Sequence, residues 1–286
     1  MNFIDNITAE KYNFLTKFTV QFSATMNLSL TNKIALVCGA SQGIGLATAQ
    51  ELAKLGATCI LLARNEESLQ KAVEELSANY NQKHRFFVAD FSNTNNVKAV
   101  AESIATNYSI HILINNTGGP ASGPIIDATE IDFINTFNQH LICNHILTKA
   151  FVPSMKKEGF GRIINIISTS VRIPLRNLGV SNTIRGAVAS WAKTMANELA
   201  QFNITVNNVL PGATKTARLE SIIKNNAAKQ GMEIENIEEE MKAEIPMKRF
   251  GEPREIAAVA AFLASPAAGY VNGVSIAVDG GRTGSL

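Results

Sequence analysis

A glycine-rich segment near the start of the chain reads Cys38-Gly39-Ala40-Ser41-Gln42-Gly43-Ile44-Gly45. It follows a short apolar run at residues 34–37, typical of a buried strand, and it precedes a helical pattern at residues 46–55. Glycines between a strand and a helix permit a tight turn and let backbone N–H groups and the helix N-terminus approach a pyrophosphate. Because the segment has both flanking elements, it predicts a dinucleotide-binding turn.

The pattern of a short apolar run followed by a longer helical segment repeats along the chain after residue 33. The runs are continuously apolar, which is typical of parallel strands covered by helices on both faces of a sheet. Strands are predicted at residues 34–37, 58–62, 85–89, 112–114, 162–167, 204–209 and 274–278. We therefore expect an α/β fold in which residues 30–286 form a single Rossmann-type domain, a doubly wound, seven-stranded parallel sheet with helices on both faces. Residues 1–29 are expected to be a poorly specified N-terminal extension, in which Met26 is an alternative start.

The 286 residues include 26 Lys and Arg against 24 Asp and Glu, a formal charge of +2, and 46% of them are hydrophobic. This balance gives no basic surface for nucleic acid or an anionic membrane, and the longest apolar run, residues 256–264, is too short to cross a bilayer. The three cysteines, Cys38, Cys59 and Cys143, lack the spacing of a zinc site. These features predict a cytoplasmic protein with no nucleic-acid, membrane or metal partner.

The spacing of the turn, GxxxGxG, resembles the fingerprint of the short-chain dehydrogenase/reductase family, with Cys38 in place of the usual Thr. Further segments resemble the motifs of that family in the same order. They are Asn115-Asn116-Thr117-Gly118, residues 161–166 as the fifth strand, Pro211-Gly212 followed by Thr216, and residues 249–253 with 279–281, which resemble 3-oxoacyl reductase-like members. The resemblance covers about residues 30–281 and implies an oxidoreductase that acts on a carbonyl or an alcohol with a nicotinamide cofactor.

The end of the second predicted strand bears on the choice of dinucleotide. An acidic residue there binds the ribose hydroxyls of NAD, whereas a basic residue favours the 2′-phosphate of NADP. Here Ala63 is followed by Arg64, whose guanidinium suits a phosphate in charge and geometry, so NADP(H) is expected over NAD(H). One alternative is that Arg64 pairs with Glu66 or Glu67. Another is that these acidic residues bind the hydroxyl groups of a ribose.

The resemblance also implies the other contacts with the dinucleotide. In addition to the residues of the turn, they are Asp90 and Phe91 at the adenine, Asn116 and Gly118 at the adenosine ribose, Pro211 and Gly212 in the PG segment, Thr216 at the nicotinamide amide and Arg185 at a ribose.

The catalytic YxxxK motif of the family is absent from this chain. In the family, the Tyr supplies a proton, the Lys lowers the pKa of that Tyr, and a Ser at the end of the preceding strand holds the carbonyl oxygen. Ser168 matches that Ser, whereas Ser181 and Arg185 stand at the Tyr and Lys positions, and His140 replaces an Asn. None of the four tyrosines is followed by Lys four positions later, so no shift of the alignment restores the motif.

These replacements change how a proton is supplied. A serine hydroxyl is far less acidic than a phenol, and an arginine stays protonated, although it can still hold a ribose. We expect Ser168 and Ser181 to donate hydrogen bonds to the substrate oxygen, with a water relayed from His140, which is expected to titrate near neutrality, supplying the proton. Alternatively, His140 is a structural histidine.

The Ser and Arg pattern is similar to that of a divergent set of reductase-like family members. The absence of the Tyr and Lys leaves two further hypotheses open. The first is a protein that binds the dinucleotide without redox turnover, as a sensor or a structural subunit. The second is an enzyme that performs non-redox chemistry on the same fold.

Residues 217–246 interrupt the regular alternation with a polar helical stretch and an acidic run, beyond the sixth strand. Because ligands bind at the carboxyl ends of strands in such folds, we interpret this insertion as a substrate lid. The alternative is a solvent-exposed helical segment with no role in substrate binding. The resemblance further implies a homodimer or homotetramer that pairs residues 132–157 and 181–200 across two-fold axes.

Overall fold

The computed structural model describes residues 26–285. Residues 1–25 of the predicted N-terminal extension therefore lie outside the described residues. Within residues 26–285, no helix is long and apolar enough to cross a membrane.

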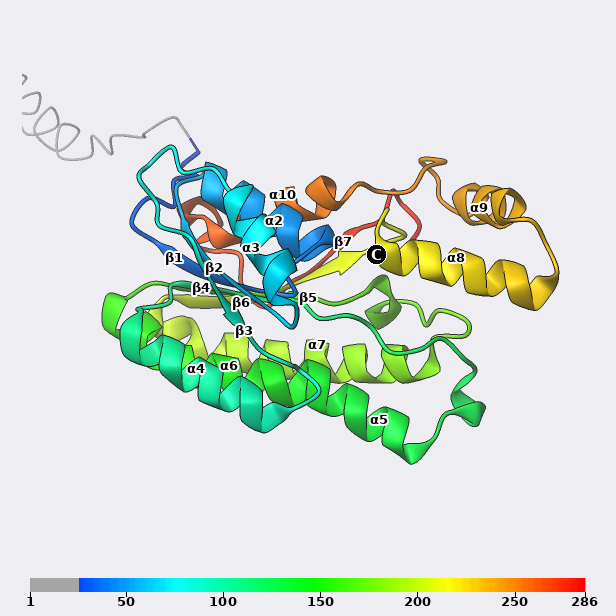
Figure 1. Cartoon of the computed structure of the whole chain (residues 1–286), viewed down its shortest axis with the longest axis horizontal. Coiled ribbons are helices and arrows are strands. Elements are labelled where there is room, and N and C mark those ends of the chain that lie inside the picture. The colour runs from blue at the N-terminus through cyan, green and yellow to red at the C-terminus, as the bar shows by residue number, and fades with distance from the viewer. Residues whose placement is uncertain (1–25, 286) are drawn as a thin grey trace, which may run out of the picture.

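A parallel sheet of seven strands, in the order β3-β2-β1-β4-β5-β6-β7, forms the middle layer (Figure 1). The strands are β1 Ile34–Cys38, β2 Thr58–Ala63, β3 Arg85–Val88, β4 Ile112–Asn115, β5 Gly161–Ile166, β6 Ile204–Pro211 and β7 Ser275–Val278. Each predicted strand is confirmed, with its ends shifted by at most two residues. The inner strands β4 and β5 are buried along their whole length, which explains their mainly apolar character, although they also contain the buried polar residues Asn115, Arg162 and Asn165.

Helices cover both faces of the sheet, as predicted (Figure 1). One face carries α2 Gly43–Lys54, α3 Glu66–Glu74 and α10 Pro253–Ala264, and the other carries α4 Thr94–Asn107, α6 Cys143–Glu158 and α7 Gly179–Leu199. Helix α5, Glu130–Phe137, continues into α6 through a π-helical turn, η2 Asn138–Ile142. The short helices are η1 Ile125–Asp127, η3 Thr169–Val171, η4 Ala200–Phe202 and η5 Pro266–Ala268.

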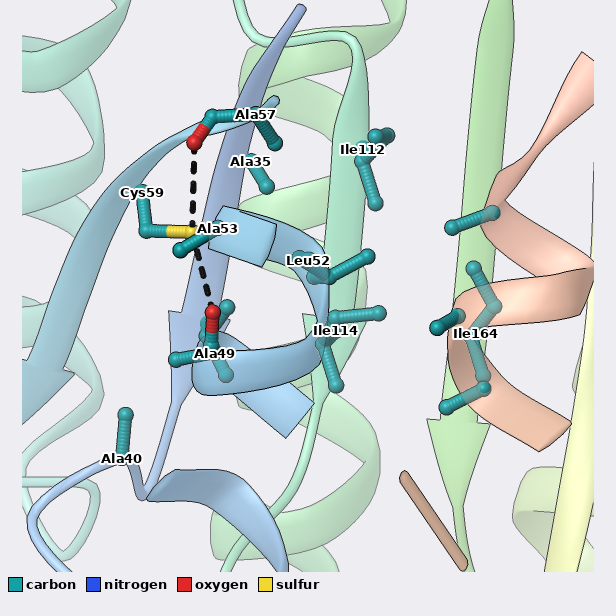
Figure 2. Packing of buried hydrophobic residues seen from close by; sticks show 14 of the residues in the cluster. Ala35, Ala40, Ala49, Leu52, Ala53, Ala57, Cys59, Ile112, Ile114 and Ile164 are labelled. Carbon is teal, nitrogen blue, oxygen red and sulfur yellow. Dashed lines mark hydrogen bonds between the residues drawn. The ribbon is translucent and has the colours of Figure 1, made fainter. Parts of the chain in front are cut away.

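Small side chains let α2 pack close to the sheet beneath it. Ala49, Leu52 and Ala53 are fully buried against the central strands, as Figure 2 shows. The neighbouring thiol of Cys59 donates weak hydrogen bonds to the carbonyl oxygens of Ala49 and Ala57, and burial raises its pKa to about 12. This cysteine therefore stays a neutral packing group, which fits its place in the core.

A chain of buried amides crosses the sheet from β4 to β7. Asn115 donates to Asn165 at 2.8 Å, Asn165 donates to Asn208 at 2.9 Å, and Asn208 donates to the hydroxyl of Ser275 at 3.0 Å. These bonds satisfy polar groups that would otherwise be costly inside the core, and they hold β4, β5, β6 and β7 in register.

Helix α7 packs one row of small and apolar residues on the sheet. Val188, Ala192 and Ala196 are buried against it, whereas the neighbouring row of Ala187, Trp191 and Met195 is only half-buried. The sheet accounts for the first row, and the second row remains partly open on the surface.

The predicted lid region forms two helices, α8 Ala217–Gln230 and α9 Ile234–Ala243, beyond the carboxyl end of β6 (Figure 1). They pack around a small apolar cluster of their own that includes Leu219, Ile223 and Ile237. Most of the apolar side chains of this insertion are therefore used for packing between its helices.

Candidate active site

A cavity of about 1470 Å³ lies along the carboxyl ends of the strands. Because parallel strands end at the same edge of a sheet, segments far apart in the sequence meet there. The predicted residues that line it are Gly39, Ser41, Gln42, Gly43, Ile44, Arg64, Asp90, Phe91, Asn116, Gly118, Ser168, Ser181, Arg185, Pro211, Gly212 and Thr216. Two other predicted residues, Gly45 and His140, are not part of its lining.

The glycine-rich turn is built for close backbone contacts. Gly39 and Gly43 both adopt a φ of +58°, which favours glycine. A Cβ atom on Gly45 would collide with the carbonyl group of Gly39, so this glycine acts by letting α2 meet the turn. Asn116 fixes the turn by donating to the carbonyl oxygens of Cys38 and Gly39, at 3.2 and 3.3 Å.

The N-terminus of α2 faces this turn without a capping side chain. Its N-cap residue, Gln42, makes no side-chain capping bond, and the first turn of the helix holds no acidic residue. The N–H groups of this first turn, together with the positive end of the helix dipole, are therefore arranged to receive an anion.

Arg64 is exposed at the end of β2 and borders the cavity. It forms no ion pair within residues 26–285, whereas Glu67, one of its expected partners, pairs with Lys71 at 2.7 Å. The expected alternative, an ion pair of Arg64 with Glu66 or Glu67, is therefore not formed in the described part of the chain. The nearby Asp90 accepts hydrogen bonds from the N–H and hydroxyl of Ser92, at 3.0 and 2.7 Å, which lower the pKa of Asp90 and keep it ionised.

Ser168, Ser181 and Arg185 come together in the same cavity. Ser168 follows β5, and its Oγ accepts a hydrogen bond from the N–H of Ser170 at 3.1 Å, which leaves its own proton available for donation. Ser181 lies in the first turn of α7 and Arg185 one turn later. Arg185 is 8% exposed, and its Nη1 donates to the carbonyl oxygen of Ile166 at 3.0 Å.

His140 requires a correction. It lies in the π-helical turn with 1% of its surface exposed, and its Nδ1 shares a hydrogen bond of 2.6 Å with the hydroxyl of Thr117. Burial, and secondarily the charge of Arg185, hold the pKa of His140 well below its usual range. The expectation that it titrates near neutrality is wrong, because a neutral imidazole is favoured in this environment.

Two residues of the site escaped the sequence analysis. Thr117 lines the cavity and contacts His140. Its only sequence signal is that Asn115-Asn116-Thr117-Gly118 has Thr where the corresponding motif of the family, NNAG, has Ala. Arg218, in the first turn of α8, also lines the cavity and donates to the carbonyl oxygen of Pro120 at 2.5 Å. Arg218 thereby links the insertion to the loop that follows β4.

Burial of His140 predicts a pH-dependent stability. Because folding lowers its pKa, the native state binds fewer protons than the unfolded state below pH 6.5, and stability falls as the pH decreases from there. Replacing His140 with Asn should reduce this loss by up to about 1.4 kcal/mol per pH unit. Urea unfolding at pH 7.5 and 5.5 checks this. Equal losses in the wild type and the His140→Asn variant would contradict it.

Comparison with known proteins places the chain in a family. A family model described as Enoyl-(Acyl carrier protein) reductase matches residues 39–283. The NADPH-dependent reductase BacG of Bacillus subtilis (strain 168) is 32% identical over 259 residues, which cover 90% of this chain and 100% of BacG. Dehydrogenase/reductase SDR family member 4 of Sus scrofa is 32% identical and covers 90% of this chain and 89% of its own. The chain belongs to the short-chain dehydrogenase/reductase family, a family of oxidoreductases.

Solved structures agree with this assignment. YwfH, described as an NADPH-dependent reductase involved in bacilysin biosynthesis, has a TM-score of 0.84 at 32% identity and covers 90% of this chain and 100% of its own. L-Sorbose reductase from Gluconobacter frateurii, complexed with NADPH and L-sorbose, has a TM-score of 0.85 at 30% identity, with 91% and 100% covered. The doubly wound fold is thus that of the family's reductases.

Proposed function

We propose that this protein is an NADPH-dependent oxidoreductase that reduces a carbonyl group, or oxidises the corresponding alcohol, with an atypical supply of the proton. The observation that carries the proposal is one continuous cavity. It joins the glycine-rich turn and Arg64 at one part of the sheet edge to Ser168 and Ser181 at another. A dinucleotide and a small substrate need such a shared space for hydride transfer.

The residues present fit NADPH. The N-terminus of α2 suits the pyrophosphate, and the unpaired Arg64 suits the 2′-phosphate. Family resemblance adds Asp90 and Phe91 at the adenine, Asn116 and Gly118 at a ribose, and Thr216 at the nicotinamide amide. The names of BacG and L-sorbose reductase, relatives that use NADPH, support the same choice. Bound NADPH would supply a hydride for the carbonyl carbon.

The chain's own residues would handle the charge that develops on the carbonyl oxygen. Ser168 and Ser181 donate hydrogen bonds to it. Burial first, and the charge of Arg218 second, lower the pKa of Arg185 to about 10, so this guanidinium remains charged at neutral pH. The proton then comes from solvent water, passed through the Ser181 hydroxyl, because His140 is neutral and does not line the cavity.

We further propose that residues 30–286 act as one domain, in which residues 217–246 close over the substrate as a lid. A homodimer or homotetramer formed through α5, α6 and α7 is supported by exposed apolar side chains on α5, namely Ile131, Ile134 and Phe137. Helix α5 is in contact with α7, on which Ala187, Trp191 and Met195 are half-buried. A cytoplasmic location is supported by the three buried free cysteines.

A turnover assay tests the proposed function. The purified protein is mixed with NADPH and a panel of ketones and aldehydes, and absorbance at 340 nm and alcohol formation are followed together. We expect equal amounts of NADPH consumed and alcohol formed with at least one compound. Saturable NADPH binding without oxidation by any of them would instead favour a dinucleotide-binding sensor or structural subunit.

A further inference from the structure

Two arginines line the cavity that also holds the predicted catalytic serines. Arg185 lies on α7, one turn after Ser181, and Arg218 lies in the first turn of α8. Both line the cavity, and the charge of Arg218 acts on Arg185. Two like charges thus border the same cavity as Ser168 and Ser181.

Neither arginine has an acidic partner within residues 26–285. Arg185 makes one hydrogen bond, to the carbonyl oxygen of Ile166, and Arg218 makes one, to the carbonyl oxygen of Pro120. A guanidinium has five N–H donors, so most donors of each group remain available. Arg185 is more than nine-tenths buried whereas Arg218 is exposed, and both line the cavity.

The acidic residues that line the cavity are engaged elsewhere. Asp90 is bound by Ser92, and Glu244 forms an ion pair with Arg282. Another cation of the lining, Lys215, is already paired with Glu252 at 2.6 Å. Arg185 and Arg218 therefore form a cationic pair for which the described part of the chain offers no counter-ion.

The phosphates of a dinucleotide have their own predicted partners, the N-terminus of α2 and Arg64. A ribose bound by Arg185 would use some of its donors, but hydroxyl groups are neutral and leave its charge uncompensated. A buried charge is tolerated when a partner of opposite charge binds it, and planar guanidinium groups match carboxylate and phosphate oxygens in geometry.

We propose that Arg185 and Arg218 bind an oxyanion carried by the substrate, a carboxylate or a phosphate, so that the enzyme acts on acidic carbonyl compounds. This inference rests on the proposed function and names the substrate class of the same cavity. Arg218 belongs to the insertion and Arg185 to α7, so residues of both segments bind the acidic group.

Two matched pairs of ketones test the inference. Acetoacetate is compared with methyl acetoacetate, and dihydroxyacetone phosphate with dihydroxyacetone. In each pair the first compound is an anion and the second is neutral. Calorimetric titration of the NADP⁺-saturated protein gives the Kd of each compound, and NADPH oxidation gives its KM. We expect the charged member of at least one pair to bind more than about tenfold more tightly than the neutral member. The pair that shows this distinguishes a carboxylate from a phosphate.

The variant Arg218→Gln should lose most of this preference. The control is Lys224→Gln, which removes the same charge from an exposed position of α8 that does not line the cavity, and which should keep the preference. Equal affinities within both pairs, including no binding by any member, would overturn the inference, as would an unchanged preference in Arg218→Gln. A loss of NADPH affinity in Arg218→Gln as large as the loss for the charged ketone would assign Arg218 to the cofactor and overturn it too.

These outcomes are separate from failure of the proposed function. If the protein reduces neutral and charged ketones equally well, the proposed function stands and the inference fails. If NADPH does not bind to the wild-type protein, the proposed function itself fails.

Discussion

Replacing Ser168 with alanine is expected to lower kcat for carbonyl reduction about 100-fold or more, while the affinity for NADPH stays close to that of the wild type. The hydroxyl of Ser168 lines the cavity, and its proton is free because Oγ accepts a bond from Ser170. A hydrogen bond to the carbonyl oxygen strengthens as negative charge develops there, so its loss falls mainly on kcat.

Steady-state kinetics and NADPH titration of the Ser168→Ala variant check this result. The control is Ser190→Ala, which removes a hydroxyl from an exposed position of α7 outside the cavity and should leave kcat unchanged. Because Ser168 also caps the short helix η3, the thermal midpoint of each variant should be measured alongside. An unchanged kcat in a well-folded Ser168→Ala protein would remove Ser168 from the mechanism.

Replacing Gly45 with alanine should abolish measurable NADPH binding. The added Cβ would overlap the carbonyl group of Gly39 and the side-chain amide of Asn116, so the turn or α2 must move. Such overpacking typically costs about 1–3 kcal/mol of stability, and the displaced N–H groups no longer converge on one anion.

The matched control is Gly186→Ala, which adds the same methyl group to a helix at a position where, apart from the chain neighbours and the backbone of the helix itself, no atom lies within 4 Å of the new Cβ. This control should be as stable as the wild type or slightly more stable, because alanine favours a helix. Chemical unfolding and NADPH titration of both variants separate loss of the turn from loss of the fold. Wild-type affinity in Gly45→Ala would show that the turn does not contact the cofactor.

The sheet and the dinucleotide turn were predictable from the sequence because both depend on local signals. The mainly apolar runs of β4 and β5 reflect burial on both faces, and the glycines at residues 39–45 mark a turn that other residues cannot form. The convergence of distant residues on one cavity followed from parallel strands, whose carboxyl ends share an edge.

The electrostatics of the site could not be obtained in this way. The state of His140 depends on a π-helical turn that buries it and on its contact with Thr117, and neither has a periodic signal. Likewise, Arg218 is an exposed residue of a polar helix, and its bond to the loop after β4 depends on the tertiary placement of α8. These features arise from tertiary packing and not from local propensity.

The most direct test of the central claim, that this cavity binds NADPH for a reductase reaction, is calorimetric titration of the protein with NADPH and with NADH. We predict saturable NADPH binding, at least about tenfold tighter than NADH binding, with the difference lost in Arg64→Ala because the 2′-phosphate loses its charged partner. Binding of neither dinucleotide by the folded wild-type protein would contradict the account.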